Sequence, residues 1–275
     1  MSQVIAVANQ KGGVSKTTTV ANLGVALVNE GRRVLAIDLD PQANLTMALG
    51  CQDPDSLPYT VSDVLEKAIR EEPIDPMEGV LHHPEGIDFL PSSIDLSGYE
   101  TRLINEYGRE HMLKQYIDAA RPFYDRILID CQPSLNVLTI NAFTAADSLL
   151  IPTQPQFFSA KGLEMLFETY GKMRKKLNPA LKIEGVLITM MDKRPSFTRD
   201  VAALVRETYG GAVRVFETEI PVSIRAVECG AQGKSIFTFD PSGRVAAAYA
   251  NLAKEVVENA AHEQRRGQYH SAPVK

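Results

Sequence analysis

Short apolar runs rich in β-branched residues alternate along this chain with segments whose apolar residues recur at helical spacing. The strand-length runs lie at residues 3–8, 34–38, 124–130, 148–152, 183–190 and 213–217. Helical spacing is found at residues 17–29, 61–70, 135–145, 160–177, 197–209 and 241–259. Strands that alternate with helices are typical of βαβ units and a parallel sheet. The sequence therefore predicts an α/β fold with a doubly wound, mostly parallel sheet flanked by helices.

Length and composition fit one large domain. With 275 residues, of which 44% are hydrophobic and 23% charged, the chain can bury a substantial core. No linker rich in Pro, Gly or Ser divides it, so we expect a single domain over residues 1–260 and a disordered tail at 261–275. No apolar run approaches the roughly 20 residues of a membrane span, and the N-terminus lacks the pattern of a secretory signal. These features predict a cytoplasmic protein without a membrane partner.

The segment after the first predicted strand has the composition of a phosphate-binding loop. Residues 9–18 read Asn-Gln-Lys-Gly-Gly-Val-Ser-Lys-Thr-Thr and lead directly into a helix. A tight loop at a helix N-terminus directs several backbone N–H groups and the positive end of the helix dipole at one point. Lys16 supplies a positive charge and Thr17 a hydroxyl group for Mg²⁺. Ser15 and Gln10 stand where the ordinary P-loop has glycine, so the strict motif is not met.

Carboxylates end two other predicted strands. Asp38 and Asp40 end the strand at 34–38, and Asp130 ends the strand at 124–130. Parallel α/β sheets bind ligands at the carboxyl ends of their strands. Because side chains alternate along a strand, Asp38 and Asp40 are expected to point the same way, one toward the Mg²⁺ water shell and one toward the attacking water.

These segments together resemble the ParA/MinD superfamily of deviant Walker A ATPases. Lys11 opens a Lys-Gly-Gly-x-x-Lys-Thr box, residues 38–42 match the DxDPQ segment, and Asp130 has a Walker B position. The resemblance implies ATP and Mg²⁺ as ligands, with Lys11, Lys16 and Asp40 as catalytic residues. It also implies a Mg²⁺ site formed by Thr17, Asp38 and Asp130. The implied nucleotide contacts of the loop are Lys11, Gly12, Gly13, Val14, Ser15, Lys16, Thr17 and Thr18.

The same resemblance implies a face-to-face homodimer in the ATP-bound state. Lys11 is expected to cross the dimer and reach the ATP of the partner subunit, where a cation stabilises the charge that develops during phosphoryl transfer. Later blocks at residues 151–154, 185–190 and 233–236 extend the resemblance over the whole chain. Adenine is expected near Met190 and Pro221. Gln132 departs from the family's usual proline, which alters the turn after Asp130.

Family members also bind DNA nonspecifically and act with a ParB-like protein bound at a centromere site, and we expect the same partners here. A net charge of −5 does not exclude a local basic surface. A basic run lies near the end of the helix at 160–177, although such a run is also typical of a solvated helix end. The candidate DNA contacts are Lys172, Arg174, Lys175, Lys176, Arg199, Arg206 and Arg225.

Three other functions are alternatives to chromosome or plasmid partition. A MinD-like membrane switch needs a C-terminal amphipathic helix with basic and bulky apolar faces, which residues 261–275 lack. A P-loop ligase for small molecules needs a pocket for a second substrate, and Lys11 together with DxDPQ argues against it. An electron donor similar to nitrogenase reductase needs cluster cysteines, but the chain has only Cys51, Cys131 and Cys229, without cluster spacing.

Overall fold

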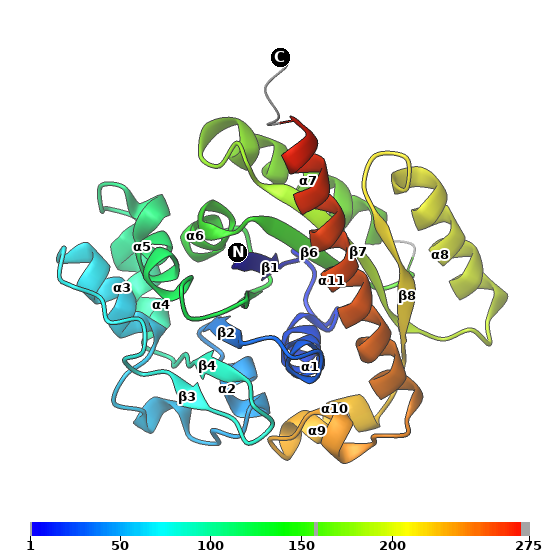
Figure 1. The fold of residues 1–275 in the computed structure, drawn as a ribbon, viewed down its shortest axis with the longest axis horizontal. Helices are drawn as coiled ribbons and strands as arrows, with labels where there is room; N and C mark the ends of the chain where they lie inside the picture. Colours follow the sequence, from blue (N-terminus) through cyan, green and yellow to red (C-terminus); the bar gives the residue numbers. More distant parts are fainter. Residues whose placement is uncertain (1, 157–158, 271–275) are drawn as a thin grey trace.

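The computed structural model describes residues 2–156 and 159–270. These residues form one sheet of eight strands in the order β3-β4-β2-β5-β1-β6-β7-β8, with β3 antiparallel to β4 and the other pairs parallel (Figure 1). The strands are β1 (Gln3–Val7), β2 (Val34–Leu39), β3 (Leu81–His82), β4 (Asp88–Leu90), β5 (Arg126–Cys131), β6 (Ser148–Thr153), β7 (Lys182–Met191) and β8 (Val215–Pro221). The predicted fold class is confirmed.

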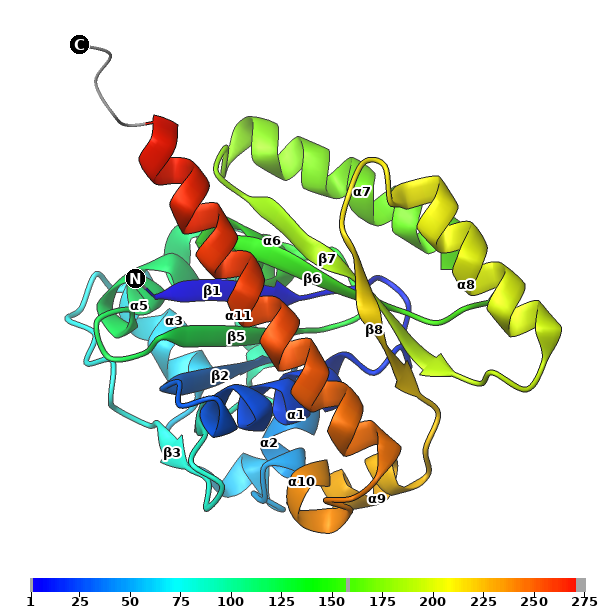
Figure 2. The ribbon, with the colours of Figure 1, turned by 45° about the vertical axis from the view of Figure 1, so that its right-hand side comes forward.

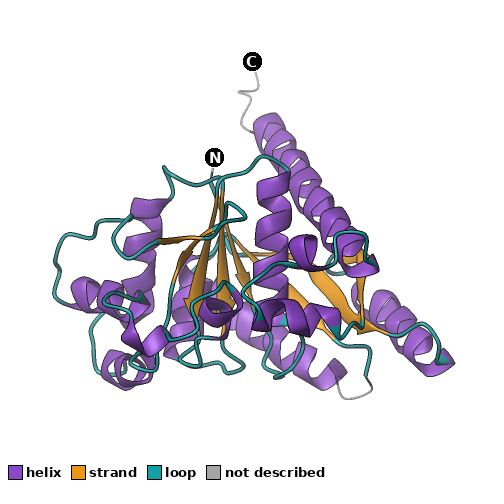
Figure 3. Cartoon of the chain, turned by 90° about the horizontal axis from the view of Figure 1, so that it is seen from below, coloured by secondary structure: helices purple, strands orange, loops and turns teal. Residues whose placement is uncertain are grey.

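Helices cover both faces of this sheet, as Figure 3 shows in a view across the strands. They are α1 (Lys16–Asn29), α2 (Asn44–Ala48), α3 (Val61–Ile69), α4 (Leu96–Leu103), α5 (Met112–Ala120), α6 (Val137–Ala145), α7 (Ser159–Lys176), α8 (Ser196–Tyr209), α9 (Arg225–Ala231), α10 (Ile236–Phe239) and α11 (Arg244–His270). Two 3₁₀ turns, η1 (Pro54–Ser56) and η2 (Arg109–His111), complete the set. Within residues 2–156 and 159–270, none of the helices combines the length and apolarity needed to cross a bilayer.

Side-chain alternation along the strands produces two hydrophobic cores. On β1, Val4 and Ala6 are buried on one face with residues of α3, α5, α6 and α7. Ile5 and Val7 are buried on the other face with residues of α1 and α11. Figure 2 shows α11 lying across that second face beside α1. Burial on both faces explains why the strands read as continuous apolar runs.

The parallel arrangement brings the functional segments to one edge. In the sheet register, Val7 and Asp38 are both paired with Asp130. The loops that follow β1, β2 and β5 therefore lie side by side at the carboxyl edge, where parallel sheets bind ligands.

The end of the chain differs from the sequence-based expectation. Helix α11 continues to His270, whereas we expected the helix to end at residue 259 and a disordered tail to begin at 261. Residues 260–266 are Ala-Ala-His-Glu-Gln-Arg-Arg, and most of these residue types favour helix, which accounts for the extension. The remainder of the expected tail, residues 271–275, lies outside the described residues.

Candidate functional site

The loop between β1 and α1 is held in place by the buried side chain of Asn9. Its Oδ1 accepts a hydrogen bond from the backbone N–H of Lys11 (3.0 Å). Its Nδ2 donates to the carbonyl oxygen of Pro152 in β6 (2.7 Å). Thr189 in β7 adds a second tie, because its hydroxyl donates to the carbonyl oxygen of Val14 (3.1 Å). Two neighbouring strands therefore fix the loop.

Ser15, the residue before α1, has the left-handed backbone angles φ 66° and ψ 31°. A residue with a Cβ atom adopts this conformation at a cost of about 1–2 kcal/mol, whereas glycine does not pay this steric cost. The side chain of Ser15 makes no capping hydrogen bond to α1 that would offset the cost. The backbone geometry thus explains why the ordinary motif has glycine at this position.

We expect Ser15→Gly to raise the free energy of unfolding by up to about 1 kcal/mol, because relief of the left-handed strain exceeds the extra backbone entropy of glycine. In thermal denaturation the midpoint should rise by about 2–3 °C for a chain of this size. Glu71→Gly is the matched control, because Glu71 also has a left-handed backbone, with φ 55°, but lies outside the loop. A lower midpoint for Ser15→Gly alone would mean that the serine hydroxyl stabilises the loop.

Lys16 places a positive charge inside the loop. Only 7% of the residue is exposed, and its Nζ donates to the carbonyl oxygen of Lys11 (3.3 Å). Burial lowers the pKa of Lys16, and the nearby Asp130 carboxylate offsets part of that effect. A buried ammonium group with so little compensation favours an anionic ligand at this point.

Thr17 and Asp130 meet beside Lys16, at the carboxyl end of β5. The Thr17 hydroxyl donates to Oδ2 of Asp130 (2.6 Å). The other carboxylate oxygen, Oδ1, is buried and has no hydrogen-bond partner within the described residues. Burial raises the pKa of Asp130 well above its usual value, and the Asp38 carboxylate raises that pKa further. A cation would compensate for both effects, so Thr17 and Asp130 fit the protein side of a Mg²⁺ site.

The two carboxylates at the end of β2 have different surroundings. Asp38 is fully buried, and its Oδ2 accepts hydrogen bonds from the backbone N–H and the hydroxyl of Thr46 in α2 (2.8 and 2.7 Å). Its Oδ1 accepts the backbone N–H of Asp40 (3.2 Å). Burial raises the pKa of Asp38 to about 6. Asp40 instead lines a cavity above the loop, and its Oδ1 accepts a hydrogen bond from the backbone N–H of Gln42 (3.0 Å). Asp38 therefore braces the segment that carries Asp40.

A cavity of about 590 Å³ opens above the loop, a size that suits a small-molecule ligand. Three walls come from segments far apart in the sequence: the loop with the start of α1, helix α2, and helix α9. Its lining includes Gly12, Gly13, Ser15, Lys16, Thr17, Thr18, Asp40, Met190, Ala226, Val227, Cys229, Gly230 and Lys234.

The structure brings most, but not all, of the predicted nucleotide contacts to this cavity. Val14 does not line the cavity, because the residue is buried and its carbonyl oxygen accepts the hydrogen bond from Thr189. Lys11 is turned away, and its Nζ donates to Oε1 of Gln156 (2.6 Å). Met190 lines the cavity, with its backbone in the left-handed region at φ 52°, and its contact with adenine stays a prediction. Pro221 does not: it lines a second cavity of about 610 Å³, between the ends of β7 and β8 and the start of α11.

The sequence is similar to one family model and to characterised bacterial proteins. The model described as an AAA domain matches residues 2–183. Soj of Bacillus subtilis, a sporulation initiation inhibitor protein, is 42% identical over 259 residues, which cover 94% of this chain and all of Soj. The chromosome partitioning protein ParA of Caulobacter vibrioides is 42% identical over 257 residues, which cover 93% of this chain and 94% of ParA. This chain belongs to the ParA/Soj family.

Membership of the ParA/Soj family confirms the resemblance drawn from Lys11, the DxDPQ segment and Asp130. A solved structure gives the same fold: cobyrinic acid a,c-diamide synthase of Mycobacterium smegmatis, with bound ATP analogue and magnesium, is 38% identical at a TM-score of 0.80. The match covers 92% of this chain and 93% of that protein.

The basic residues predicted as candidate DNA contacts do not form one surface. Lys172, Arg174, Lys175 and Lys176 are exposed at the end of α7, just before β7 begins, and so lie at the amino edge of the sheet. Arg225 lies at the start of α9, beside the cavity at the opposite edge. Arg199 and Arg206 lie on α8.

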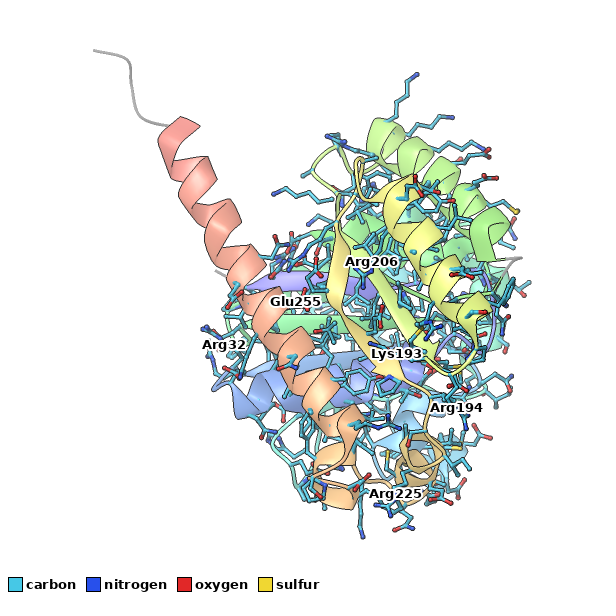
Figure 4. The ribbon with its side chains drawn as sticks, turned by 90° about the vertical axis from the view of Figure 1, so that its right-hand side faces the viewer. Arg32, Lys193, Arg194, Arg206, Arg225 and Glu255 are labelled. Carbon is cyan, nitrogen blue, oxygen red and sulfur yellow. The ribbon has the colours of Figure 1, made fainter. Side chains whose placement is uncertain are left out.

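Two further basic residues, Lys193 and Arg194, lie between α8 and α9 and were not predicted from the sequence. Figure 4 shows Lys193 and Arg194 on the same side of the molecule as Arg206 and Arg225. Both follow β7 directly, at the carboxyl edge of the sheet. The Asp-Lys-Arg sequence immediately after a strand was the signal that could have identified them.

Proposed function

We propose that this chain is a Mg²⁺-dependent ATPase that forms an ATP-sandwich dimer, binds DNA nonspecifically and partitions a chromosome or plasmid together with a ParB-like protein. The observation that supports the proposal most directly is the buried Lys16 ammonium near Asp130, whose Oδ1 has no hydrogen-bond partner among the residues that the structure describes. A polyphosphate satisfies the first group and a divalent cation the second.

The loop, the start of α1 and the end of β5 together hold the triphosphate. The backbone N–H groups of the loop and the N-terminus of α1 bind phosphate oxygens, and Lys16 adds a charge-assisted hydrogen bond. Thr17 and Asp130 hold the Mg²⁺ side, where the metal neutralises negative charge on the phosphates. Met190 and α9 leave room in the cavity for the base.

Hydrolysis needs a positioned water and an added positive charge. Asp40 lines the cavity with its carboxylate oriented by Gln42, so it can orient a water and accept a proton from it. Lys11 is held by Gln156 on its own subunit, away from the cavity. From this position Lys11 can reach the nucleotide of a second subunit. ATP hydrolysis is then slow until the second subunit completes the site.

Exposed apolar side chains around the cavity support the dimer. Met190 and Val227 line the cavity and are 37% and 67% exposed, and Val222 and Ile224 nearby in the chain are 47% and 78% exposed. Apolar groups gathered around a ligand site are typical of a surface that a second protein covers.

The decisive experiment compares the purified chain with and without ATP and Mg²⁺. We expect sedimentation velocity to show a monomer without nucleotide and a dimer with ATP, and retention on nonspecific DNA only for the dimer. A chain that neither binds ATP nor changes its sedimentation with Mg²⁺ present would contradict the proposal.

The similarity to a diamide synthase makes a small-molecule ligase the second candidate. A ligase must hold its second substrate next to the terminal phosphate. The second cavity shares no lining residue with the loop cavity, which favours the partition ATPase. Amide formation from a carboxylate substrate, ATP and an amine donor would reverse this preference.

Arg225→Glu is expected to lower the affinity of the ATP-loaded chain for random-sequence duplex DNA by about 10-fold or more, because DNA affinity depends on phosphate neutralisation. Arg225 begins a helix of the cavity wall, so its surface is the one that nucleotide can control. Fluorescence anisotropy at several salt concentrations gives both the affinity and its salt dependence, which should also decrease.

Lys175→Glu makes the same charge change at the amino edge of the sheet and serves as the control for Arg225→Glu. We expect it to lower DNA affinity by less than about threefold, as a long-range electrostatic effect only. The opposite ranking of the two variants would move the DNA surface to the end of α7.

A further inference from the structure

The second cavity, of about 610 Å³, lies outside the nucleotide site, between the ends of β7 and β8 and the start of α11. It shares no lining residue with the cavity above the phosphate loop. Its volume is within the range of cavities that hold small organic molecules. The second cavity is therefore large enough for a complete small-molecule ligand, rather than for a single ion only.

A bulge in β8 forms one wall of the second cavity. Glu219 pairs with Ile188, and the preceding pair is Val215 with Val186, so four steps along β8 match two steps along β7. Bulges redirect side chains and are frequent next to binding sites. This bulge brings Thr218 and Glu219 to the cavity.

Two helices hold the bulge in its shape. Arg206 of α8 donates to the carbonyl oxygen of Phe216 (2.9 Å). From α11, the carboxylate of Glu255 accepts the backbone N–H groups of Glu217 (3.1 Å) and Thr218 (2.9 Å). Figure 4 shows Arg206 and Glu255 on this side of the molecule. The wall is therefore preformed, and a ligand does not have to order it on binding.

The two carboxylates that line the second cavity are both bound by basic side chains. Glu219 binds Lys193 (3.0 Å) and Arg206 (3.3 Å). Asp192 binds two guanidinium nitrogens of Arg194 (2.9 and 2.7 Å). Because both acidic groups are already compensated, any further basic residue gives the cavity a surplus of positive charge.

Arg244 is such a residue. It is the first residue of α11 and is exposed, and no described carboxylate lies within ion-pair distance of its guanidinium. Hydrogen bonds from Arg194 lower the pKa of Asp192 to about 2, and the charge of Arg244 adds to this effect. Arg244 therefore lies near Asp192 with its own N–H donors available. A planar guanidinium with available donors matches the oxygens of a phosphate group.

The rest of the lining suits an organic ring with a polar edge. Met191, Pro221 and Val222 give the cavity an apolar side. Asn251 lies about two helical turns after Arg244 on the same face of α11, and it also lines the cavity. Its side-chain amide is exposed and makes no hydrogen bond to the residues that the structure describes. An asparagine amide offers a donor and an acceptor that match the edge of adenine.

We propose that the second cavity binds one molecule of ADP, separate from the phosphate loop, with Arg244 on the phosphates and Asn251 on the adenine edge. The base lies against the apolar side. This site is weaker than the phosphate loop, because it has neither a buried ammonium group nor a helix N-terminus surrounded by backbone N–H groups. The proposal does not depend on the partition function proposed above.

Equilibrium dialysis of the full chain against radiolabelled ADP with Mg²⁺ counts the sites. We expect two ADP molecules per wild-type chain at saturation, one bound tightly by the loop and one bound at higher ADP concentration. Arg244→Gln should keep the tight site and lower the affinity of the second site by about 10-fold or more, as for loss of a charge-assisted hydrogen bond. Lys16→Met should weaken the tight site and leave the second site unchanged.

Arg32→Gln is the matched control, because Arg32 is also an exposed arginine but lies just before β2, at the amino edge of the sheet. It should leave both sites unchanged. Saturation of the wild-type chain at one ADP, or a second site that Arg244→Gln does not weaken, would overturn the inference.

Duplex DNA provides a further test of what the second cavity binds. If Arg244→Gln lowers the affinity for random-sequence duplex DNA but not for ADP, this part of the molecule belongs to a DNA surface and the inference is wrong. Loss of the tight site from the wild-type chain, with the second site present, would instead contradict the proposed function and leave the inference in place.

Discussion

Lys16→Met is expected to lower the affinity of this chain for Mg-ATP by about 100-fold or more. The substitution keeps the length of the side chain but removes the ammonium group that is buried in the phosphate loop. A hydrogen bond to a charged group contributes about 1.5–3 kcal/mol, and the residual loop then lacks its fixed positive charge. Isothermal titration of the purified variant with ATP and Mg²⁺ measures the loss.

The same variant should be at least as stable as the wild type without nucleotide. The pKa of Lys16 is lower in the folded chain than in the unfolded chain, so the charged form disfavours folding at neutral pH. Between those two pKa values the unfolded chain binds more protons, and the free energy of unfolding of the wild type rises with pH across that window. Lys16→Met removes this dependence, which thermal denaturation at several pH values can detect.

Lys234→Met provides the control for both measurements. Lys234 lines the same cavity but is exposed at its far wall, and we expect its removal to change ATP affinity by less than about fivefold. Equal losses for the two variants would mean that the loop does not hold the phosphates in the way proposed.

The features that could be predicted from sequence are local ones. Strands buried on both faces read as apolar runs, and Lys16 with Thr17 follows such a run within a few residues, so the loop was recognisable. Strands β3 and β4 were not predicted, because they have only two and three residues in a region rich in polar residues and proline. Helix α5 was missed as well, although its inward face is apolar.

The rest of the site depends on contacts between distant parts of the chain. Helix α9 follows the loop by about 200 residues and still forms a wall of the same cavity. No local sequence pattern predicts which distant segment packs beside the loop. Pro221 was placed beside the base by resemblance, whereas the end of β8 directs it to the second cavity. The burial of Asp38 against Thr46 required knowledge of where α2 packs. The structure shows Asp38 in contact with Thr46, and the metal role of Asp38 stays a prediction.

Asp40→Asn is expected to lower the rate of ATP hydrolysis by about 100-fold or more while ATP affinity changes little. A neutral amide cannot accept a proton from the attacking water, and loss of a general base typically costs 10²–10⁴-fold in rate. Asp40 contacts neither the loop nor Lys16 by any hydrogen bond in the described residues, so phosphate binding should persist. Phosphate release under single turnover measures the rate, and titration with a fluorescent ATP analogue measures the affinity.

Asp38→Asn separates the two carboxylates. Its Oδ2 accepts two hydrogen bonds from Thr46, whose hydroxyl also accepts the N–H of Ser92 (2.9 Å), so the substitution disturbs a buried network. We expect this variant to lose about 1–3 kcal/mol of unfolding free energy, and to lose hydrolysis only as far as Asp40 is displaced. If Asp40→Asn hydrolyses ATP at the wild-type rate while a folded Asp38→Asn variant does not, the hydrolytic role belongs to Asp38. Asp40 would then act only as a turn residue.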